Sequence, residues 1–265
     1  GVQTCALPIS PPTFQWRVAV NTSMDTTQIT GASTPRTEPP IKQGLYDPAN
    51  EHDACGVGFV AHVKGVKSHA LVQHGLQILN NLDHRGACGS EVNTGDGAGI
   101  LMQMPHDFVA AACAAANIRL PAPGDYGTGL LFLPRDPKQR RKVELAFEKI
   151  VNSEGQDFLG WRRVPTDNSS LGDTAKASEP WIAMPVIGKG PDIADAEAFE
   201  RKLYVIRKRS YTEIRTSTLA GAEYWYVASL STRTFVYKGM LTTDQVDHYF
   251  PDLKHPSDRK STRLN

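Results

Sequence analysis

Short apolar segments, each bounded by turn residues, recur along the chain after residue 54. Runs of this length with small and β-branched residues predict strands rather than helices. A further pair of apolar runs, 224–231 and 234–239, predicts a β-hairpin. The other expected strands are 55–63, 97–105, 127–134, 158–165 and 181–187.

Apolar residues at helical spacing predict the helices. One begins after Ser68 as its N-cap, continues to Leu82 and stops near Gly86. A charged helix begins at Pro137 and ends before Gly155. The other expected helices are 196–209, whose basic run 202–209 favours a solvated face, a short one in 242–249, and an Ala-rich one that packs Cys113 in the core.

Two stretches lack a clear period. Residues 166–178 are polar and predict a loop, and residues 10 to about 42 are rich in Pro, Thr, Ser and Gln, which is typical of a flexible leader. Strands and helices are mixed without strict alternation. The expected fold class is therefore α+β and layered, rather than a doubly wound sheet or an (βα)₈ barrel.

The two ends of the chain are related at the level of DNA. Residues 1–9 can be encoded by GGAGTTCAGACGTGTGCTCTTCCGATC, and residues 258–265 by GATCGGAAGAGCACACGTCTGAAC. The second string is the reverse complement of most of the first, and both resemble a sequencing-library adapter. We expect both ends to be adapter-derived. The expected organisation is then a leader over 10–54, with Met24 as a candidate initiator, and one domain over 55–257.

Composition excludes several classes of protein. The 265 residues carry 29 Lys+Arg against 28 Asp+Glu, a net charge of +1, which argues against a dedicated nucleic-acid binder. No apolar run approaches the roughly 18–20 residues that cross a bilayer, so no membrane span is expected. Four cysteines without C-x-x-C spacing are too few for a disulfide scaffold and predict neither a metal nor a redox site. A reduced, cytoplasmic compartment is expected.

Cys55 is the most informative candidate for chemistry. It opens an expected strand and precedes Gly56 and Gly58, whose small size keeps a sulfur atom accessible. From the residues alone, a small buried structural cysteine is the favoured interpretation, because a lone cysteine at the start of a strand more often packs in the core than reacts. Cys88 and Cys113 have the same structural interpretation, and fewer features of the sequence favour a chemical role for them.

Several motifs in order favour the chemical interpretation of Cys55. The runs GLYDPANEHDACGVGFVAHVKG, LQILNNLDHRGACG and TGDGAGILMQMP are followed by FERKLYVIRKR and YVASLSTRTFVYKGML. Together they closely resemble the N-terminal class II glutamine amidotransferase domain of the glutamate synthase large-subunit family. The resemblance covers about residues 44–253, and separate motifs in one order are far more specific than a single pattern.

The resemblance implies an N-terminal-nucleophile hydrolase: a four-layer αββα sandwich, here truncated at its C-terminal side. It implies cleavage between Ala54 and Cys55, so that 10–54 becomes a propeptide. Cys55 is then the nucleophile that attacks L-glutamine, and its freed α-amine is the general base, since an α-amino group ordinarily has a pKa of about 7.7–8.0.

Two more segments acquire meaning from the resemblance. Arg85 matches a His-Arg-Gly turn close to the nucleophile, where its guanidinium can bind a substrate carboxylate. The alternative is a structural arginine that caps the preceding helix. His84 is interpreted as structural. The turn 94–99 lacks the lysine of a phosphate-binding loop and is expected to lead into a strand near the site.

For an intact enzyme the resemblance implies more. Ammonia would pass to a distant site that holds FMN, react there with 2-oxoglutarate, and yield glutamate after reduction. An iron–sulfur cluster and either a small electron-donating subunit or ferredoxin would supply electrons. No cofactor and no metal are expected in this domain itself, and a plastid location is the alternative to the cytoplasm.

Two other functions stay open at this point. The chain can be another class II amidotransferase, of the phosphoribosyl-pyrophosphate or glucosamine-phosphate type, which shares the Cys-Gly start and the His-Arg-Gly turn. It can also be a non-catalytic, amidotransferase-like binding module.

The polypeptide as given is predicted to have no glutamate synthase activity and little or no glutaminase activity. The family's oxyanion donors and carboxylate-binding arginine are expected beyond residue 253, and one oxyanion donor accounts for about 10²–10³ in rate. Robust ammonia release from glutamine by the purified chain, measured with a coupled assay, would refute this prediction.

Overall fold

The computed structural model describes residues 42, 44, 47, 56–86 and 91–254. The chain divides into residues 1–37 and 38–265, and every described residue belongs to the second part. Its helices are α1 (His69–Asn81), α2 (His106–Ala115), α3 (Pro137–Ser153), α4 (Asp173–Ser178), α5 (Ala196–Ser210) and α6 (Val246–Tyr249). Its strands are β1 (Ala98–Gln103), β2 (Tyr126–Thr128), β3 (Leu131–Leu133), β4 (Asp157–Arg163), β5 (Trp181–Gly188), β6 (Tyr226–Val227) and β7 (Thr234–Gly239). Shorter helical turns are η2 (Asp83–Arg85), η3 (Tyr211–Arg215), η4 (Ala222–Tyr224), η5 (Thr243–Gln245) and η6 (Pro251–Lys254).

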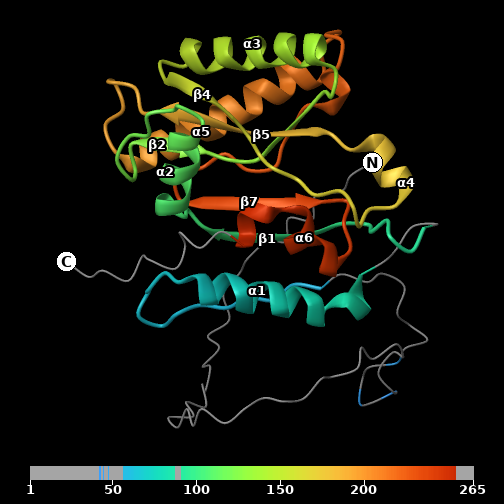
Figure 1. Ribbon diagram of the computed structural model, residues 1–265. Coiled ribbons are helices and arrows are strands. Elements are labelled where there is room, and N and C mark those ends of the chain that lie inside the picture. The colour runs from blue at the N-terminus through green and yellow to red at the C-terminus, as the bar shows by residue number, and fades with distance from the viewer. Residues whose placement is uncertain (1–41, 43, 45–46, 48–55, 87–90, 255–265) are drawn as a thin grey trace. The chain divides into compact units, whose positions relative to one another are not determined.

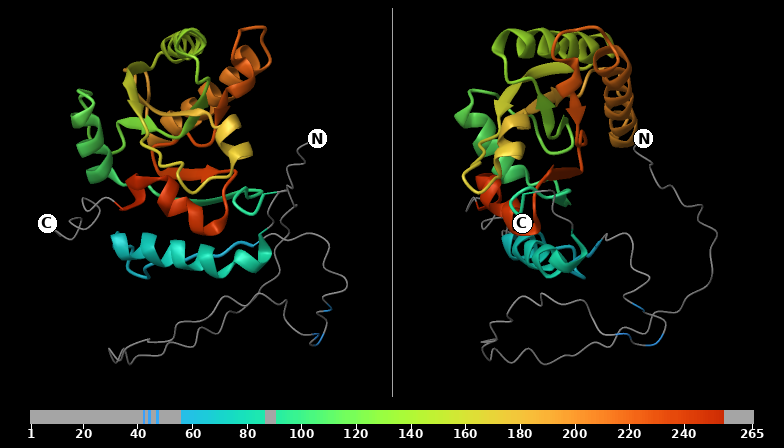
Figure 2. Two further views of the ribbon diagram at one scale, coloured as in Figure 1. Left: turned by 45° about the vertical axis from the view of Figure 1, so that its right-hand side comes forward. Right: turned by 90° about the vertical axis from the view of Figure 1, so that its right-hand side faces the viewer.

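These elements form four layers (Figure 1). Helices α3 and α5 pack on each other and cover a five-stranded sheet; a two-stranded sheet of β1 and β7 follows, and α1 packs against β1. The two views of Figure 2 keep α1 on the outer side of the two-stranded sheet. The expected α+β class and αββα layering are therefore confirmed. No helix among the described residues is long and apolar enough to span a bilayer.

β5 is the central strand of the larger sheet. It pairs antiparallel with β4 on one side and with both β2 and β3 on the other, and β6 extends the sheet beyond β3. Because side chains alternate between the two faces of a strand, β5 contributes to two cores. Ile182, Met184 and Val186 face a core shared with α1, α2, β1 and β7, whereas Ala183 and Ile187 face the core beneath α3 and α5.

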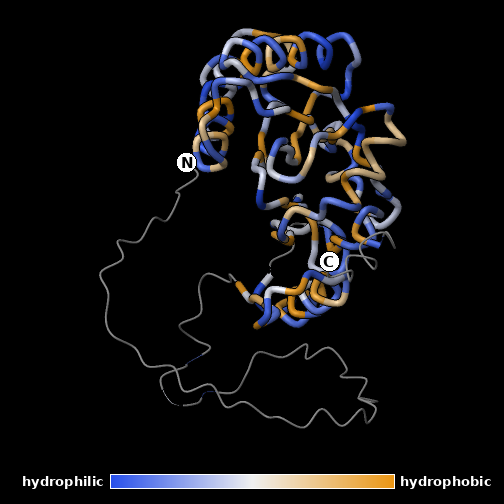
Figure 3. The backbone as a smooth tube through the Cα atoms, turned by 90° about the vertical axis from the view of Figure 1, so that its left-hand side faces the viewer, coloured by the Kyte–Doolittle hydropathy of each residue, from blue (hydrophilic) through white to orange (hydrophobic). Residues whose placement is uncertain are grey.

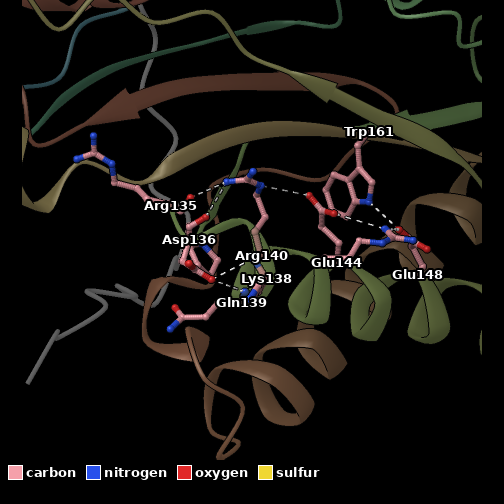
Figure 4. A network of polar contacts seen from close by, with 10 residues as sticks. Arg135, Asp136, Lys138, Gln139, Arg140, Glu144, Glu148 and Trp161 are labelled. Atoms are coloured by element: carbon pink, nitrogen blue, oxygen red, sulfur yellow. Dashed lines mark hydrogen bonds and ion pairs between the residues drawn. The ribbon is translucent and has the colours of Figure 1, made fainter.

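The start of α3 shows how local sequence specifies a helix. Asp136 accepts hydrogen bonds from the backbone N–H groups of Lys138 (3.0 Å) and Gln139 (2.8 Å), and Pro137 occupies the first turn, where its missing N–H costs nothing. Figure 4 shows this cap and the charged residues that follow it. Hydrophobic and hydrophilic positions alternate around the helix, at the top of Figure 3, as the predicted amphipathic pattern requires. The predicted helix is confirmed.

α3 is tied to the sheet by polar contacts on its exposed side. The Trp161 indole N–H donates to Glu148 at 2.9 Å, and Arg141 donates to the same carboxylate at 2.7 Å (Figure 4). Trp161 also packs its ring against Phe147, with the ring centroids 5.5 Å apart. The amphipathic Trp161 thus connects β4 to both the apolar and the polar side of α3.

The expected single strand over 127–134 is wrong, because the structure breaks it into β2 and β3. Between the two stretches of β5 that pair with them lies Pro185. In an antiparallel ladder a residue presents its N–H and C=O to the same neighbour, and proline has no N–H to present. The ladder is therefore interrupted at Pro185, and the Pro185 carbonyl accepts a hydrogen bond from the Thr128 side-chain hydroxyl at 2.7 Å.

The expected hairpin of 224–231 and 234–239 is also wrong. β6 pairs with β3 in the larger sheet, whereas β7 pairs with β1 in the smaller one. The Glu200 carboxylate on α5 accepts hydrogen bonds from the Ser231 hydroxyl (2.5 Å), the Thr232 N–H (2.8 Å) and the Thr232 hydroxyl (2.7 Å). These bonds satisfy polar groups of the connection where it passes from one sheet to the other.

Two further expectations need correction. The polar loop over 166–178 contains α4 at its end. Residues 56–63, expected as part of a buried strand, form no strand, and Val57 and Phe59 are each 90% exposed. A β-carbon on Gly58 would lie 2.3 Å from Ile78 Cγ2, so α1 covers one side of this segment. Alternation places Val57 and Phe59 on the other side, where no described element covers them.

A buried ion pair joins the two sheets. Both terminal nitrogens of Arg162 on β4 donate hydrogen bonds to the Asp252 carboxylate in η6, at 2.6 and 2.8 Å. The two side chains are only 11% and 5% exposed. The Tyr237 hydroxyl on β7 donates to the same carboxylate at 3.0 Å. Burial, and after it the Asp252 charge, raise the pKa of Tyr237, which keeps the hydroxyl protonated as a donor.

Replacing Asp252 by Ala is predicted to destabilise the fold by about 3–5 kcal/mol, because it leaves the Arg162 guanidinium buried without its counter-ion. Urea denaturation followed by tryptophan fluorescence measures the loss. The control is Glu197→Ala, which removes the partner of Arg233 from a pair whose side chains are 61% and 52% exposed, and it should leave the midpoint nearly unchanged. Equal midpoints for the two variants would contradict the prediction.

Candidate functional site

The predicted nucleophile, Cys55, lies outside the described residues, and so does Cys88. The site is therefore built from Gly56, the next residue in the chain, and from the segments that lie against it. A β-carbon on Gly56 would be 3.1 Å from Arg85 Cβ and 3.1 Å from Leu82 Cδ2. The backbone one residue after Cys55 thus lies against the end of α1 and the turn that follows it.

Arg85 ends η2, a single 3₁₀ turn that immediately follows α1. The Arg85 N–H donates to the Leu82 carbonyl at 2.8 Å, and the Gly86 N–H donates to the Asp83 carbonyl at 2.9 Å. Arg85 is half-buried. The structure places this arginine next to Gly56, and its role in substrate binding stays a prediction.

His84, in the same turn, is exposed and lies with Nδ1 3.1 Å from the Asn81 carbonyl oxygen. A carbonyl only accepts, so Nδ1 is the donor in this contact. The contact closes the end of α1, which supports the structural interpretation of His84.

The glycine-rich turn 94–99 leads into β1, as predicted, and not into a helix. Gly95 lies directly against the backbone of the segment before η5: a β-carbon there would be 2.2 Å from the Leu241 carbonyl and 2.4 Å from Thr242 N. A turn of this kind brings backbone to backbone and offers no helix N-terminus for a phosphate.

The loop before this turn is fastened by a carboxylate. Glu91 accepts hydrogen bonds from the hydroxyls of Thr94 and Thr174, both at 2.8 Å, and from the Thr174 N–H. Hydrogen bonds from Thr174 and Thr94 lower the pKa of Glu91, so the carboxylate stays ionised at neutral pH. Glu91 thus joins the loop to the start of α4.

A groove of about 660 Å³ runs from Gly56 between α1 and β1. Its walls are mainly apolar, with leucines and isoleucine from α1 and with Ile100, Leu101 and Met102 from β1. Such a surface suits an aliphatic group but cannot solvate the charged α-amino and α-carboxylate groups of an amino acid. Arg85 does not line the groove, and it lies against Gly56 at one end of it.

Cys113 on α2 is the one cysteine within the described residues, and it is fully buried. Burial raises the pKa of its thiol, so it is neutral and unreactive at physiological pH. The expectation of a core cysteine is confirmed. Nor do the described residues contain a group of three His, Cys, Asp or Glu side chains that could hold a metal ion.

Sequence comparison decides the family. Residues 55–264 match the family Glutamine amidotransferases class-II. The chain belongs to the class-II glutamine amidotransferases. The matched range begins at Cys55, the residue predicted to be the nucleophile. The predicted boundaries at residues 9, 54 and 257 stay predictions.

Three relatives of this amidotransferase chain share the words glutamate synthase in their names. The chain is 45% identical over 215 residues to the glutamate synthase (NADPH) large chain of Bacillus subtilis, and the aligned region covers 81% of this chain and 14% of the relative. It is 41% identical over 222 residues to glutamate synthase (NADH) of Schizosaccharomyces pombe, with 82% of this chain and 10% of the relative covered. It is 35% identical over 206 residues to ferredoxin-dependent glutamate synthase 2 of Synechocystis, covering 78% and 13%. The chain thus spans 10–14% of the length of these relatives.

Three residues beside the site were not singled out from the sequence: Asp83, Thr243 and Gln245. Thr243 and Gln245 belong to η5, whose N-cap Thr242 and third residue Gln245 form a capping box. The pattern T-x-x-Q at 242–245 is the sequence signature of that box and was present in the expected final helix. Its connection to Asp83 has no sequence signature, because 160 positions separate the two residues.

Replacing Gly95 by Ala is predicted to destabilise the fold by about 1–3 kcal/mol, because the new methyl group would overlap the backbone of Leu241, which cannot move aside like a side chain. Urea denaturation measures the change. The control is Gly188→Ala, whose methyl group would meet side-chain atoms without overlap, the end of Leu159 at 3.3 Å and Asp157 Cβ at 3.4 Å. A midpoint shift no larger than that of the control would contradict the predicted backbone contact.

Proposed function

We propose that the chain is the glutamine-hydrolysing domain of a glutamate synthase, with Cys55 as its nucleophile. The observation that carries the proposal is the contact between Gly56 and the turn of Arg85, in a chain whose family match begins at Cys55. An arginine, whose guanidinium can bind a carboxylate, thus lies against Gly56, the residue that follows the proposed nucleophile in the chain. The shared name of the relatives supports glutamate synthase over the other amidotransferase types.

The proposed reaction has two steps. After cleavage between Ala54 and Cys55, the free α-amine takes the thiol proton, and the sulfur attacks the side-chain amide carbon of glutamine. The amide nitrogen leaves as ammonia with that proton, and a γ-glutamyl thioester remains. Water then attacks the thioester, which gives glutamate and restores the thiol.

For the intact protein we propose that the ammonia reacts with 2-oxoglutarate, and that FMN and an iron–sulfur cluster serve the reduction. The described residues do not fit either group. Cys113 is their one thiol and it is buried in the core, and the glycine-rich turn 94–99 leads into a strand, not a helix. We therefore place both groups in other parts of the intact protein and derive no step through them. The electron donor is proposed to be a small subunit or ferredoxin, and the location the cytoplasm, with a plastid as the alternative.

A diazoketone analogue of L-glutamine is predicted to modify Cys55 after the chain has been processed to begin at that residue. N-terminal sequencing gives the first residue, and peptide mass spectrometry locates the adduct. The analogue reports thiolate reactivity and substrate recognition without a complete turnover. Excess L-glutamine should slow the modification, because it competes for the same site, and excess D-glutamine should not.

Two variants serve as controls for this labelling. Cys55→Ala should abolish the adduct, whereas Cys113→Ser should leave it unchanged, since Cys113 is buried and its thiol is neutral. An unprocessed chain whose cysteines react no faster with the analogue than with iodoacetamide would contradict the proposed function and support the non-catalytic module.

A further inference from the structure

The turn that carries Arg85 has a partner far away in the sequence. Its backbone bonds, from Arg85 N–H to the Leu82 carbonyl and from Gly86 N–H to the Asp83 carbonyl, are local and set its shape. The turn directly follows α1, which packs against β1. A contact distant in sequence joins the turn to η5 as well: the Thr243 hydroxyl donates to Oδ1 of Asp83, the first residue of η2, at 2.8 Å.

Thr243 is itself held firmly. It is the first residue of η5, and the capping box of Thr242 and Gln245 closes that turn. Gln245 is 4% exposed and has three hydrogen bonds: its Oε1 accepts from the Thr242 N–H at 3.0 Å, and its Nε2 donates to the carbonyls of Asn93 (3.0 Å) and Ser170 (2.9 Å). A buried amide with its hydrogen bonds satisfied resists displacement, because any movement leaves polar groups unpaired.

The same segment holds the second turn of the site. Gln245 fixes the Asn93 carbonyl, and Gly95 lies against the backbone of Leu241 and Thr242. Residues 241–245 therefore contact both the loop that leads into the glycine-rich turn and the turn of Arg85. A single element thus contacts two segments that both lie far from it in the sequence.

We propose that Thr243 is a positioning residue for glutamine recognition: by holding Asp83 it keeps the turn of Arg85 against Gly56, where the guanidinium assists the binding of the substrate α-carboxylate. The proposal rests on the proposed function, because it assigns Thr243 a role in that same site. Thr243 touches neither substrate nor reacting sulfur; it acts through Asp83 and the η2 turn.

A selectivity measurement separates positioning from a merely structural role. The rate of Cys55 modification is measured with the diazoketone analogue of L-glutamine and with iodoacetamide, and the ratio of the two rates is the readout. Recognition of the α-carboxylate contributes to the first rate only. Modification of the buried Cys113 is monitored in the same samples, because it reports loosening of the fold.

Thr243→Val removes the hydroxyl with little change in volume. It should lower the ratio about 3- to 10-fold, the range that the loss of one hydrogen bond produces, while Cys113 stays protected. Thr243→Ser keeps the hydroxyl, and Asp83→Asn keeps an acceptor oxygen, so both should retain most of the selectivity. Thr212→Val is the matched control, because the Thr212 hydroxyl in η3 donates to the Lys208 carbonyl at the end of α5, and the change should leave the ratio unchanged.

Each contrary result has a distinct meaning. A Thr243→Val chain with the wild-type ratio overturns the proposal. So does a Thr243→Val chain in which both rates change together and Cys113 becomes reactive, since that is the result of a structural role. If the unaltered chain itself shows no selectivity for the analogue over iodoacetamide, the proposed function fails, and the role of Thr243 falls with it.

Discussion

The buried ion pair between Arg162 and Asp252 is the interaction on which the rest of the structure depends. It joins β4 of the larger sheet to η6, and Tyr237 adds β7 of the smaller sheet to the same carboxylate. Taking two charges out of water is costly, and bidentate geometry with a third hydrogen bond offsets that cost only in one arrangement. The relative position of the two sheets is therefore specified by polar geometry as well as by apolar packing. Apolar contacts have no preferred direction, so by themselves they would let one sheet slide over the other.

The candidate site is assembled on the outer side of this double sheet. Gly56, the turn of Arg85 and the glycine-rich turn come from the first half of the described chain, and residues 241–245 from its end hold two of them in place. Residues 241–245 directly precede α6 and η6, where Asp252 lies. One short stretch of chain thus serves both the joining of the sheets and the geometry of the site, which makes the site sensitive to changes in the core.

Local physics explains where prediction from the sequence succeeded. The helices α1, α3 and α5 follow from apolar spacing, and α3 also from its cap and its first-turn proline, because these signals act within a few residues. Prediction failed where pairing partners decide. The runs at 224–231 and 234–239 were assigned to a hairpin by proximity, yet they pair with β3 and β1 in different sheets, and Glu200 binds the connection between them.

The sequence by itself determined the layered α+β class, the candidate nucleophile and the resemblance to the amidotransferases, since motifs such as the cysteine with its following glycines and the His-Arg-Gly turn are contiguous in the chain. Only the tertiary structure decided that Arg85 lies against Gly56, and that Thr243 and Gln245 hold the two turns. Asp83 and Thr243 are 160 positions apart, and no local propensity records such a contact. It exists because the closing of the core brings the end of the described chain back to the end of α1.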